Sequence, residues 1–153
     1  FLKKVLDLFN FNIINTKISV LGWAYKKETN DSRESASIYV ATKLLEQGAI
    51  INIYDPMVPK EKIMLDLKLL MEDRGNSKEK LKKILANIKI SSNIERCISK
   101  SEAVLVLTEW DEFKNFDWDY LFNNLENPPF VIDGRNIIRM NKKNNNKLYS
   151  IGK

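Results

Sequence analysis

Two cations that could hold an anion lie in a polar loop near the start of the chain. The apolar run at residues 17–21 ends at Gly22, and the loop that follows carries Lys26 and Arg33. A helix is predicted directly after this loop, and the positive end of a helix dipole favours a bound anion. The loop has one glycine where the dinucleotide-binding fingerprint needs three, so it does not predict ordinary dinucleotide binding.

A structural interpretation of the same loop is also open. Asp31 and Glu34 stand three residues apart, the spacing of a capping box, which predicts that they begin the following helix. In this interpretation Arg33 pairs with Asp31 or Glu34, and Lys26 is solvated.

Two carboxylates and a tryptophan follow the apolar run at residues 103–107. Glu109 and Asp111 form a pair of acidic residues of the kind that can perform general acid and base catalysis. The simpler interpretation is structural, with Asp111 as a helix cap and Trp110 as a packing residue.

A third candidate is the turn Asp133-Gly134-Arg135, which follows the predicted strand at residues 130–132. The flat guanidinium of Arg135 is a two-pronged donor suited to phosphate, and Gly134 permits a tight turn. Asp133 can hold either the arginine or the turn. Asp55, at the end of another apolar run, could bind a ribose hydroxyl, but we prefer the common Asp-Pro turn.

The composition excludes several kinds of site and partner. The absence of histidine excludes Ser-His and Cys-His pairs and zinc bound by imidazole. The single cysteine, Cys97, excludes an internal disulfide and a multi-cysteine metal site, and its predicted helical position indicates an inert, partly buried thiol. We expect no metal site.

The net charge of +5 arises from basic residues that are interleaved with acidic ones. Nucleic-acid binding usually needs a clustered basic face, and no apolar run approaches the roughly 20 residues that span a bilayer. We therefore expect neither nucleic acid nor a membrane as a partner. A small anion such as a phosphate ester fits the charge, and so does a merely solvated surface.

Predicted strands and helices alternate along the chain. The continuous apolar run at residues 103–107 indicates a strand covered on both faces, which favours a parallel sheet between helices. The sequence thus predicts an α/β fold with a doubly wound, mostly parallel sheet, whose ligands bind at the carboxyl ends of the strands. Strands are expected over residues 17–21, 50–54, 88–90, 103–107, 130–132 and 148–151. One helix is expected to begin after residue 31 and to end at Gly48, and others are expected over residues 59–73, 77–86, 93–98 and 117–125.

The first nine residues have helical spacing of apolar side chains, at Leu2, Val5, Leu6 and Phe9. Because the chain begins at Phe1, we interpret them as the end of an amphipathic helix that starts earlier. The alternative is a short N-terminal helix that packs on its own domain.

Four stretches, taken in order, resemble the C-terminal domain of the UDP-glucose/GDP-mannose dehydrogenase family. They are KISVLGWAYKKETNDSRES (17–35), IYDP (53–56), AVLVLTEWDEFKNFDW (103–118) and VIDGRN (131–136), and the closing SIGK is similar as well. The resemblance implies a three-layer Rossmann-like domain that binds a UDP-sugar over residues 16–153. Residues 1–15 would then be the end of the family's central connecting helix and a linker.

The resemblance also implies roles for single residues. Tyr25, Lys26 and Arg135 match residues that contact the UDP-sugar, although the family more often has Phe where this chain has Tyr25. Arg33 matches the arginine that reaches the NAD, which is bound mainly by an N-terminal domain. No residue of this chain matches a catalytic one, because the motif G-F-G-G-x-C is absent and Cys97 does not match its cysteine.

The implied reaction is the oxidation of UDP-glucose to UDP-glucuronate with two NAD, by a cytoplasmic homo-oligomer. The chain alone would lack the catalytic cysteine and be inactive. Two alternatives remain open: a nucleotide-sugar binding or regulatory module without catalysis, and a paralogue that acts on another UDP-sugar or on GDP-mannose.

Overall fold

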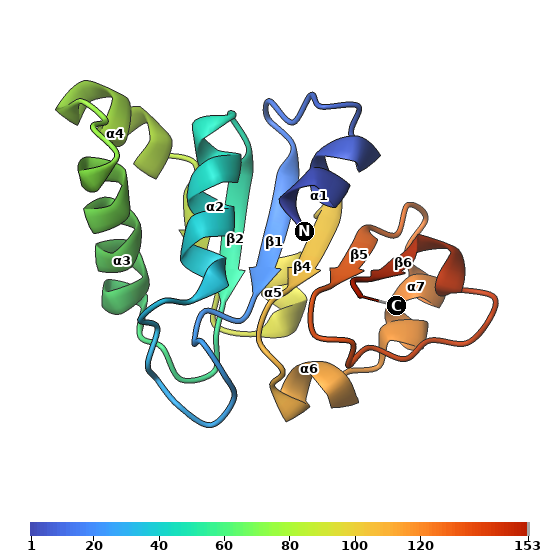
Figure 1. Cartoon of the computed structure of the whole chain (residues 1–153). Helices are drawn as coiled ribbons and strands as arrows, with labels where there is room; N and C mark the ends of the chain where they lie inside the picture. Colours follow the sequence, from blue (N-terminus) through green and yellow to red (C-terminus); the bar gives the residue numbers. More distant parts are fainter. Residues whose placement is uncertain (153) are drawn as a thin grey trace.

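Six parallel strands form a single sheet in the computed structural model, which describes residues 1–152 (Figure 1). Their order is β3-β2-β1-β4-β5-β6, so the winding direction reverses between β1 and β4. The predicted doubly wound parallel sheet is therefore confirmed. The strands are β1 (Lys17–Leu21), β2 (Ile50–Tyr54), β3 (Ile88–Ile90), β4 (Ala103–Val106), β5 (Phe130–Asp133) and β6 (Leu148–Ser150).

Helices on both faces of the sheet complete the predicted three-layer, Rossmann-like arrangement. In Figure 1, α1 and α2 lie in front of the sheet and α5 lies behind it, while α3 packs against α2. The helices are α1 (Leu2–Leu8), α2 (Ala36–Glu46), α3 (Lys60–Asp73), α4 (Lys78–Leu85), α5 (Ile94–Ile98), α6 (Asp111–Asn115), α7 (Trp118–Asn124) and a 3₁₀ turn at Asn145–Lys147.

Two of the predicted helix caps are wrong. Ser35, not the Asp31–Glu34 pair, caps α2, because its hydroxyl accepts the main-chain N–H of Ser37 at 3.3 Å. Glu34 has a φ of +60°, which is incompatible with a place inside the helix. Likewise Trp110 occupies the cap position of α6, and Asp111 is the first helical residue, where its charge still complements the helix dipole.

The strands differ in how their two faces are covered. β4 is buried at all four residues, as its continuous apolar run predicts. Ser19 of β1 faces α5, because its hydroxyl donates to the Cys97 carbonyl at 2.6 Å. By alternation and strand register, Lys17, Asn52 and Lys89 lie on the same side of the sheet. The side of β1–β3 that faces α5 therefore carries these polar residues beside apolar ones such as Ile50, which lies opposite Lys17.

α1 packs on its own domain. Val5 is fully buried, and the Phe1 ring lies against the turn that follows β5. A Cβ placed at Gly134 would come within 3.1 Å of both the Phe1 ring and the Val106 carbonyl oxygen. The N-terminal helix is thus confirmed, and it contacts the turn that precedes Arg135.

Candidate functional site

The loop after β1 passes so close to the end of β4 that its first residue must be glycine. Gly22 has a φ of +99°, and a Cβ there would lie 2.7 Å from the Thr108 backbone nitrogen. The Thr108 hydroxyl donates to the Ala24 carbonyl at 2.6 Å. The carboxyl ends of β1 and β4 are thereby joined where the strand order reverses, which is where doubly wound sheets bind ligands.

Asp55, at the end of β2, holds the start of this loop. Its buried carboxylate accepts five hydrogen bonds of 2.6–3.1 Å, from the main chain of Trp23 and Ala24, from the indole of Trp110 and from the main chain of residues 57–58. These donors use the acceptor capacity of the carboxylate, so the turn interpretation of Asp55 is the correct one and a ribose hydroxyl finds no free acceptor there.

A second buried carboxylate, Asp66 on α3, holds the middle of the loop. It accepts hydrogen bonds from the Trp23 indole at 3.0 Å, the Ser32 hydroxyl at 2.5 Å and the Lys62 ammonium at 2.5 Å. Asp66 is not among the site residues predicted from the sequence. The available signal was its position three residues after Ile63, on the apolar face of the predicted helix.

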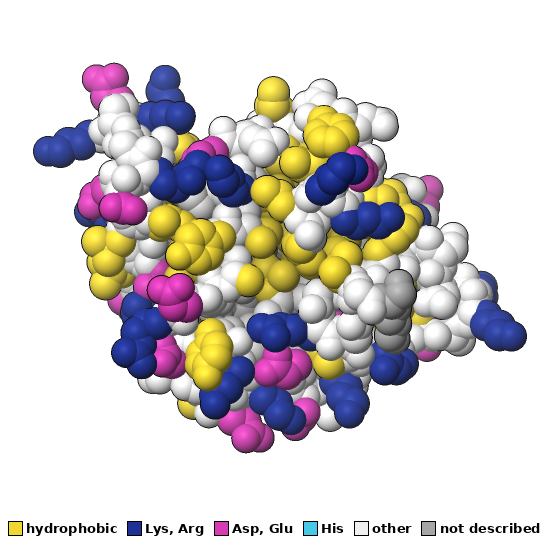
Figure 2. Space-filling view, viewed as in Figure 1, with side chains coloured by type: hydrophobic (Ala, Val, Ile, Leu, Met, Phe, Trp, Pro, Cys, Tyr) yellow, Lys and Arg dark blue, Asp and Glu magenta, His cyan; other side chains and the backbone are white. Residues whose placement is uncertain are grey.

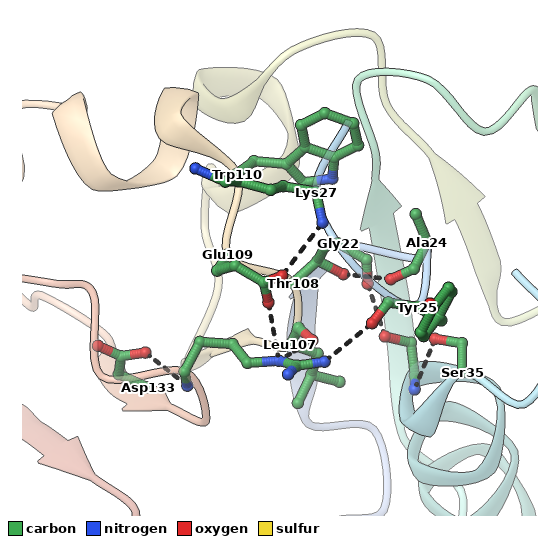
Figure 3. Close-up of polar contacts among 12 residues, drawn as sticks. Gly22, Ala24, Tyr25, Lys27, Ser35, Leu107, Thr108, Glu109, Trp110 and Asp133 are labelled. Atoms are coloured by element: carbon green, nitrogen blue, oxygen red, sulfur yellow. Dashed lines mark hydrogen bonds and ion pairs between the residues drawn. The ribbon is translucent and has the colours of Figure 1, made fainter. Parts of the chain in front are cut away.

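Arg135 connects the three loops at the carboxyl edge of the sheet through its contacts with Tyr25, Leu107 and Glu109, which are labelled in Figure 3. Its Nε donates to the Leu107 carbonyl at 2.9 Å, and its Nη2 donates to the Tyr25 carbonyl at 3.1 Å. Its Nη1 makes no hydrogen bond to any residue in the described part of the chain. Asp133 accepts the main-chain N–H of Arg135 at 3.0 Å and so holds the turn rather than the guanidinium.

Glu109 lies between Arg135 and the loop after β1 (Figure 3). One carboxylate oxygen accepts the Lys27 main-chain N–H at 3.2 Å, and the other is buried, 3.4 Å from Arg135 Nε. Asp111 instead pairs with the Lys27 ammonium at 3.4 Å. The two carboxylates therefore serve separate contacts and do not form an acid and base pair. Trp110 is the packing residue that the sequence predicts, since only 8% of it is exposed.

Tyr25 and Lys26 lie exposed at the tip of the same loop. The Lys26 ammonium is 5.5 Å from the centre of the Tyr25 ring and forms no ion pair within residues 1–152. Because Arg135 binds the Tyr25 carbonyl, the fold brings the predicted residues Tyr25, Lys26 and Arg135 together. They offer two cations and an aromatic ring to an anionic ligand.

Arg33 lies apart from this group. Its guanidinium binds the Asp31 carboxylate at 2.8–3.2 Å, and this hydrogen-bonded cation lowers the pKa of Asp31 to about 2. Arg33 lines an open hollow of about 590 Å³ together with Pro59 and Lys62, whereas Lys26 and Arg135 do not line it. The predicted pairing of Arg33 with Asp31 is confirmed for the free protein.

Cys97 lies on α5 and packs against the middle of the sheet, with its sulfur 3.4 Å from the Asn52 carbonyl oxygen. It is fully buried under the sheet, and burial raises the pKa of its thiol to about 12. The prediction of an inert thiol is confirmed. No group of three or more Cys, Asp or Glu side chains within residues 1–152 is arranged to hold a metal ion.

The visible face of the molecule carries mixed charges along this edge. Figure 2 shows Lys and Arg side chains intermixed with Asp and Glu along the lower border, where the arrowheads of β1 and β2 point in Figure 1. This part of the surface is therefore not a one-signed basic face of the kind used for nucleic acid. Within the described residues, no helix combines the length and apolar composition needed to cross a membrane.

A family model described as the UDP binding domain of the UDP-glucose/GDP-mannose dehydrogenase family matches residues 19–140. The chain belongs to this family. The match includes the loop after β1, the buried carboxylates Asp55 and Asp66, and the turn with Arg135. The candidate site thus lies within the part of the chain that defines its family membership.

Similar curated proteins are UDP-glucose 6-dehydrogenases. The Gallus gallus protein of that name is 37% identical over 90% of this chain, and UDP-glucose 6-dehydrogenase 4 of Arabidopsis thaliana is 38% identical over 97% of it. The matched regions are only 27% and 32% of those two proteins. The family member described here therefore spans about a third of the length of these relatives.

Solved structures of dehydrogenases share the fold. A UDP-glucose dehydrogenase from Pyrobaculum islandicum gives a TM-score of 0.63 at 23% identity, over 97% of this chain and 28% of that one. A UDP-D-ManNAc dehydrogenase from Pyrococcus horikoshii gives 0.67 at 22% identity, over 99% of this chain and 29% of that one. At these identities the likeness supports the architecture alone.

Proposed function

We propose that this chain is the UDP-binding part of a UDP-glucose 6-dehydrogenase, which oxidises UDP-glucose to UDP-glucuronate with two NAD. One observation supports this proposal most strongly. The carbonyls of Leu107 and Tyr25 hold Arg135 at the place, between β1 and β4, where the strand order reverses, and Lys26 lies next to Tyr25 in the same loop. Both cations are suited to a pyrophosphate, and Tyr25 offers a ring beside them. In this proposal the chain binds, orients and neutralises the UDP group.

The proposal assigns residues 1–15 to the end of a connecting helix and a linker, and residues 16–153 to the UDP-sugar-binding domain. It also includes a cytoplasmic location and a homo-oligomer. The loop after β1 is not suited to bind NAD. Its one glycine is Gly22, and it lacks the glycine-rich turn that lets a backbone approach a pyrophosphate. The residues of this chain therefore do not form an NAD site of their own, and Arg33 is the residue we assign to contact NAD held elsewhere.

A second candidate function is a nucleotide-sugar binding or regulatory module without catalysis. The isolated chain would behave in this way in either case, because its one thiol, Cys97, is buried and unreactive. A related alternative keeps the catalysis but uses another UDP-sugar or GDP-mannose as the substrate.

Calorimetric titration of the 153-residue chain with UDP and with GDP tests the proposal. We expect UDP to bind with a dissociation constant in the high micromolar to millimolar range, about −4 to −6 kcal/mol, and GDP to bind more weakly. UDP-glucose with NAD should give no NADH absorbance. Preferential GDP binding would contradict the UDP assignment, and sustained turnover would contradict the division of roles.

A further inference from the structure

Two adjoining cavities form a basic trough on the side of the sheet that carries α5. They have volumes of about 190 and 340 Å³ and share Lys89 and Ser99 in their walls. Among the described residues that line them, no side chain is acidic. The trough is defined by four cations, Lys17, Lys89, Arg96 and Lys100, and four hydroxyls, Ser91, Ser92, Ser99 and Ser101.

The cations of the basic trough have no side-chain acceptor among the described residues. Within residues 1–152, the charged groups of all four form no ion pair and no hydrogen bond. The neighbouring acids are Glu102, whose carboxylate accepts the Lys17 main-chain N–H at 2.8 Å, and Glu95, exposed on α5. Four cations against two acids leave this side of the sheet with a positive excess.

The sheet gives an independent reason to regard the trough as specialised. Lys17, Asn52 and Lys89 lie on one side of β1–β3 together with apolar residues such as Ile50, whereas β4 is apolar and buried at all four residues. The covering helix on this side, α5, has only five residues. The cations therefore line open cavities rather than pack against a helix.

We propose that the basic trough binds a multiply charged phosphate, such as pyrophosphate or the phosphates of an ester, at a place separate from the candidate UDP site. Lysine ammonium groups bind phosphate as point charges. The hydroxyls of Ser92 and Ser99 form no hydrogen bond within residues 1–152 and can donate to phosphate oxygens, whereas Ser91 donates to Asn52 at 2.7 Å and Ser101 is hydrogen-bonded to Ser19. Lys89 and Ser99 line both cavities, so they can serve two adjacent phosphate groups at once.

Amide NMR of the 153-residue chain, titrated with pyrophosphate at constant ionic strength, tests this site. We expect saturable shifts at Lys89 and at residues 99–101. Lys89→Gln should weaken binding by about threefold to tenfold, the effect of removing one partly exposed charge-assisted contact. Lys142→Gln, which removes an exposed lysine outside the trough, should leave the dissociation constant unchanged.

Pyrophosphate can also reach the candidate UDP site, so the titration is repeated on Arg135→Lys. Saturable shifts at residues 99–101 with an unchanged midpoint would support a separate site even if the UDP proposal failed. Three results would overturn the inference. The shifts could be confined to Lys26 and Gly134, they could rise without saturation, or the midpoint for Lys89→Gln could equal that of the wild type. Tighter binding of a single-stranded oligonucleotide at the trough would overturn the assignment to a small anion.

Discussion

The side chain of Arg135 is hydrogen-bonded to the main chain of Tyr25, with Nη2 donating to the carbonyl at 3.1 Å. Residues 25 and 135 are far apart in the sequence, so this bond fixes the position of the loop that carries Lys26 relative to Arg135. The guanidinium binds the protein through Nε and Nη2 and leaves Nη1 for a ligand. Arg135 is therefore a structural connection and a candidate ligand donor at the same time.

Replacing this arginine with lysine should affect both roles. Arg135→Lys keeps the charge but loses the flat donor, and we expect UDP binding to weaken by about 10- to 150-fold, or roughly 1.5–3 kcal/mol. In the whole enzyme the Michaelis constant for UDP-glucose should rise accordingly. The carbonyls of Leu107 and Tyr25 also lose their donors, so the free energy of unfolding should fall by about 1–2 kcal/mol.

Calorimetry with UDP and urea denaturation of the same protein measure the two effects. Arg139→Lys is the matched control, because within residues 1–152 the Arg139 guanidinium binds only carbonyls of its own segment, at Asn136 and Ile138. Lower stability with unchanged UDP affinity would make Arg135 purely structural and remove it from the site.

Glu109→Gln should separate charge from geometry at the site. Glutamine keeps a carbonyl oxygen for the Lys27 main-chain N–H but removes the negative charge beside Arg135. We expect the unfolding free energy to fall by about 1–2 kcal/mol, and UDP affinity at low salt to rise by about threefold to tenfold. The rise should shrink as salt is added, because added ions screen the charges. A lower affinity would show instead that Glu109 is needed to orient Arg135.

Gly22→Ala should be strongly destabilising. The Cβ would meet the Thr108 backbone nitrogen at 2.7 Å, at a residue whose φ is already +99°. We expect the unfolding free energy to fall by about 3 kcal/mol or more. Gly75→Ala is the matched control, since Gly75 also has a positive φ but has nothing within 4 Å of its Cβ position, and about 1 kcal/mol is expected there. Equal losses would contradict the proposed close approach of the two strand ends.

The ion pair between α2 and the end of α3 should make stability depend on pH. Arg74 binds both carboxylate oxygens of Glu46, at 2.5 and 2.9 Å, and these hydrogen bonds lower the pKa of Glu46. The unfolded chain therefore takes up the proton first, so the contribution is full above the ordinary pKa of about 4.3 and is lost as the pH falls through the lowered folded value. Arg74→Gln should lower the melting temperature slightly at pH 7, as is usual for the loss of an ion pair at the surface.

Thermal melts of wild type and Arg74→Gln at pH 7 and at strongly acidic pH measure this effect. The two melting temperatures should differ at pH 7 and converge in acid, where Glu46 is protonated in both proteins. A difference that persists unchanged in acid would mean that Arg74 stabilises the protein through packing rather than through its charge.

Local sequence patterns predict most of the fold because they reflect local physics. The apolar run of β4 predicts a fully buried strand, and the structure confirms it. The predicted cap of α2 is wrong for a local reason as well. The Asp31 carboxylate is bound by Arg33, and the hydroxyl of Ser35 accepts the main-chain N–H of Ser37 instead. Spacing alone does not reveal which of several nearby polar side chains is already paired.

The candidate site is predictable only for the residues that lie at strand ends. Lys26 and Arg135 can be placed by strand order, whereas Asp66 acts on Trp23 from 43 residues away in the sequence. Its partners become visible only when α3 is packed beside the loop. Glu109 is similar, because its role depends on the approach of the Arg135 turn, which no local pattern encodes.

The Phe1 ring limits which residue can occupy position 134, in the turn before Arg135. A Cβ at Gly134 would come within 3.1 Å of that ring and of the Val106 carbonyl oxygen. A larger residue there would have to displace either the start of the chain or the end of β4. The first residue of the chain and the turn that carries Arg135 therefore constrain each other, although they lie near opposite ends of the sequence.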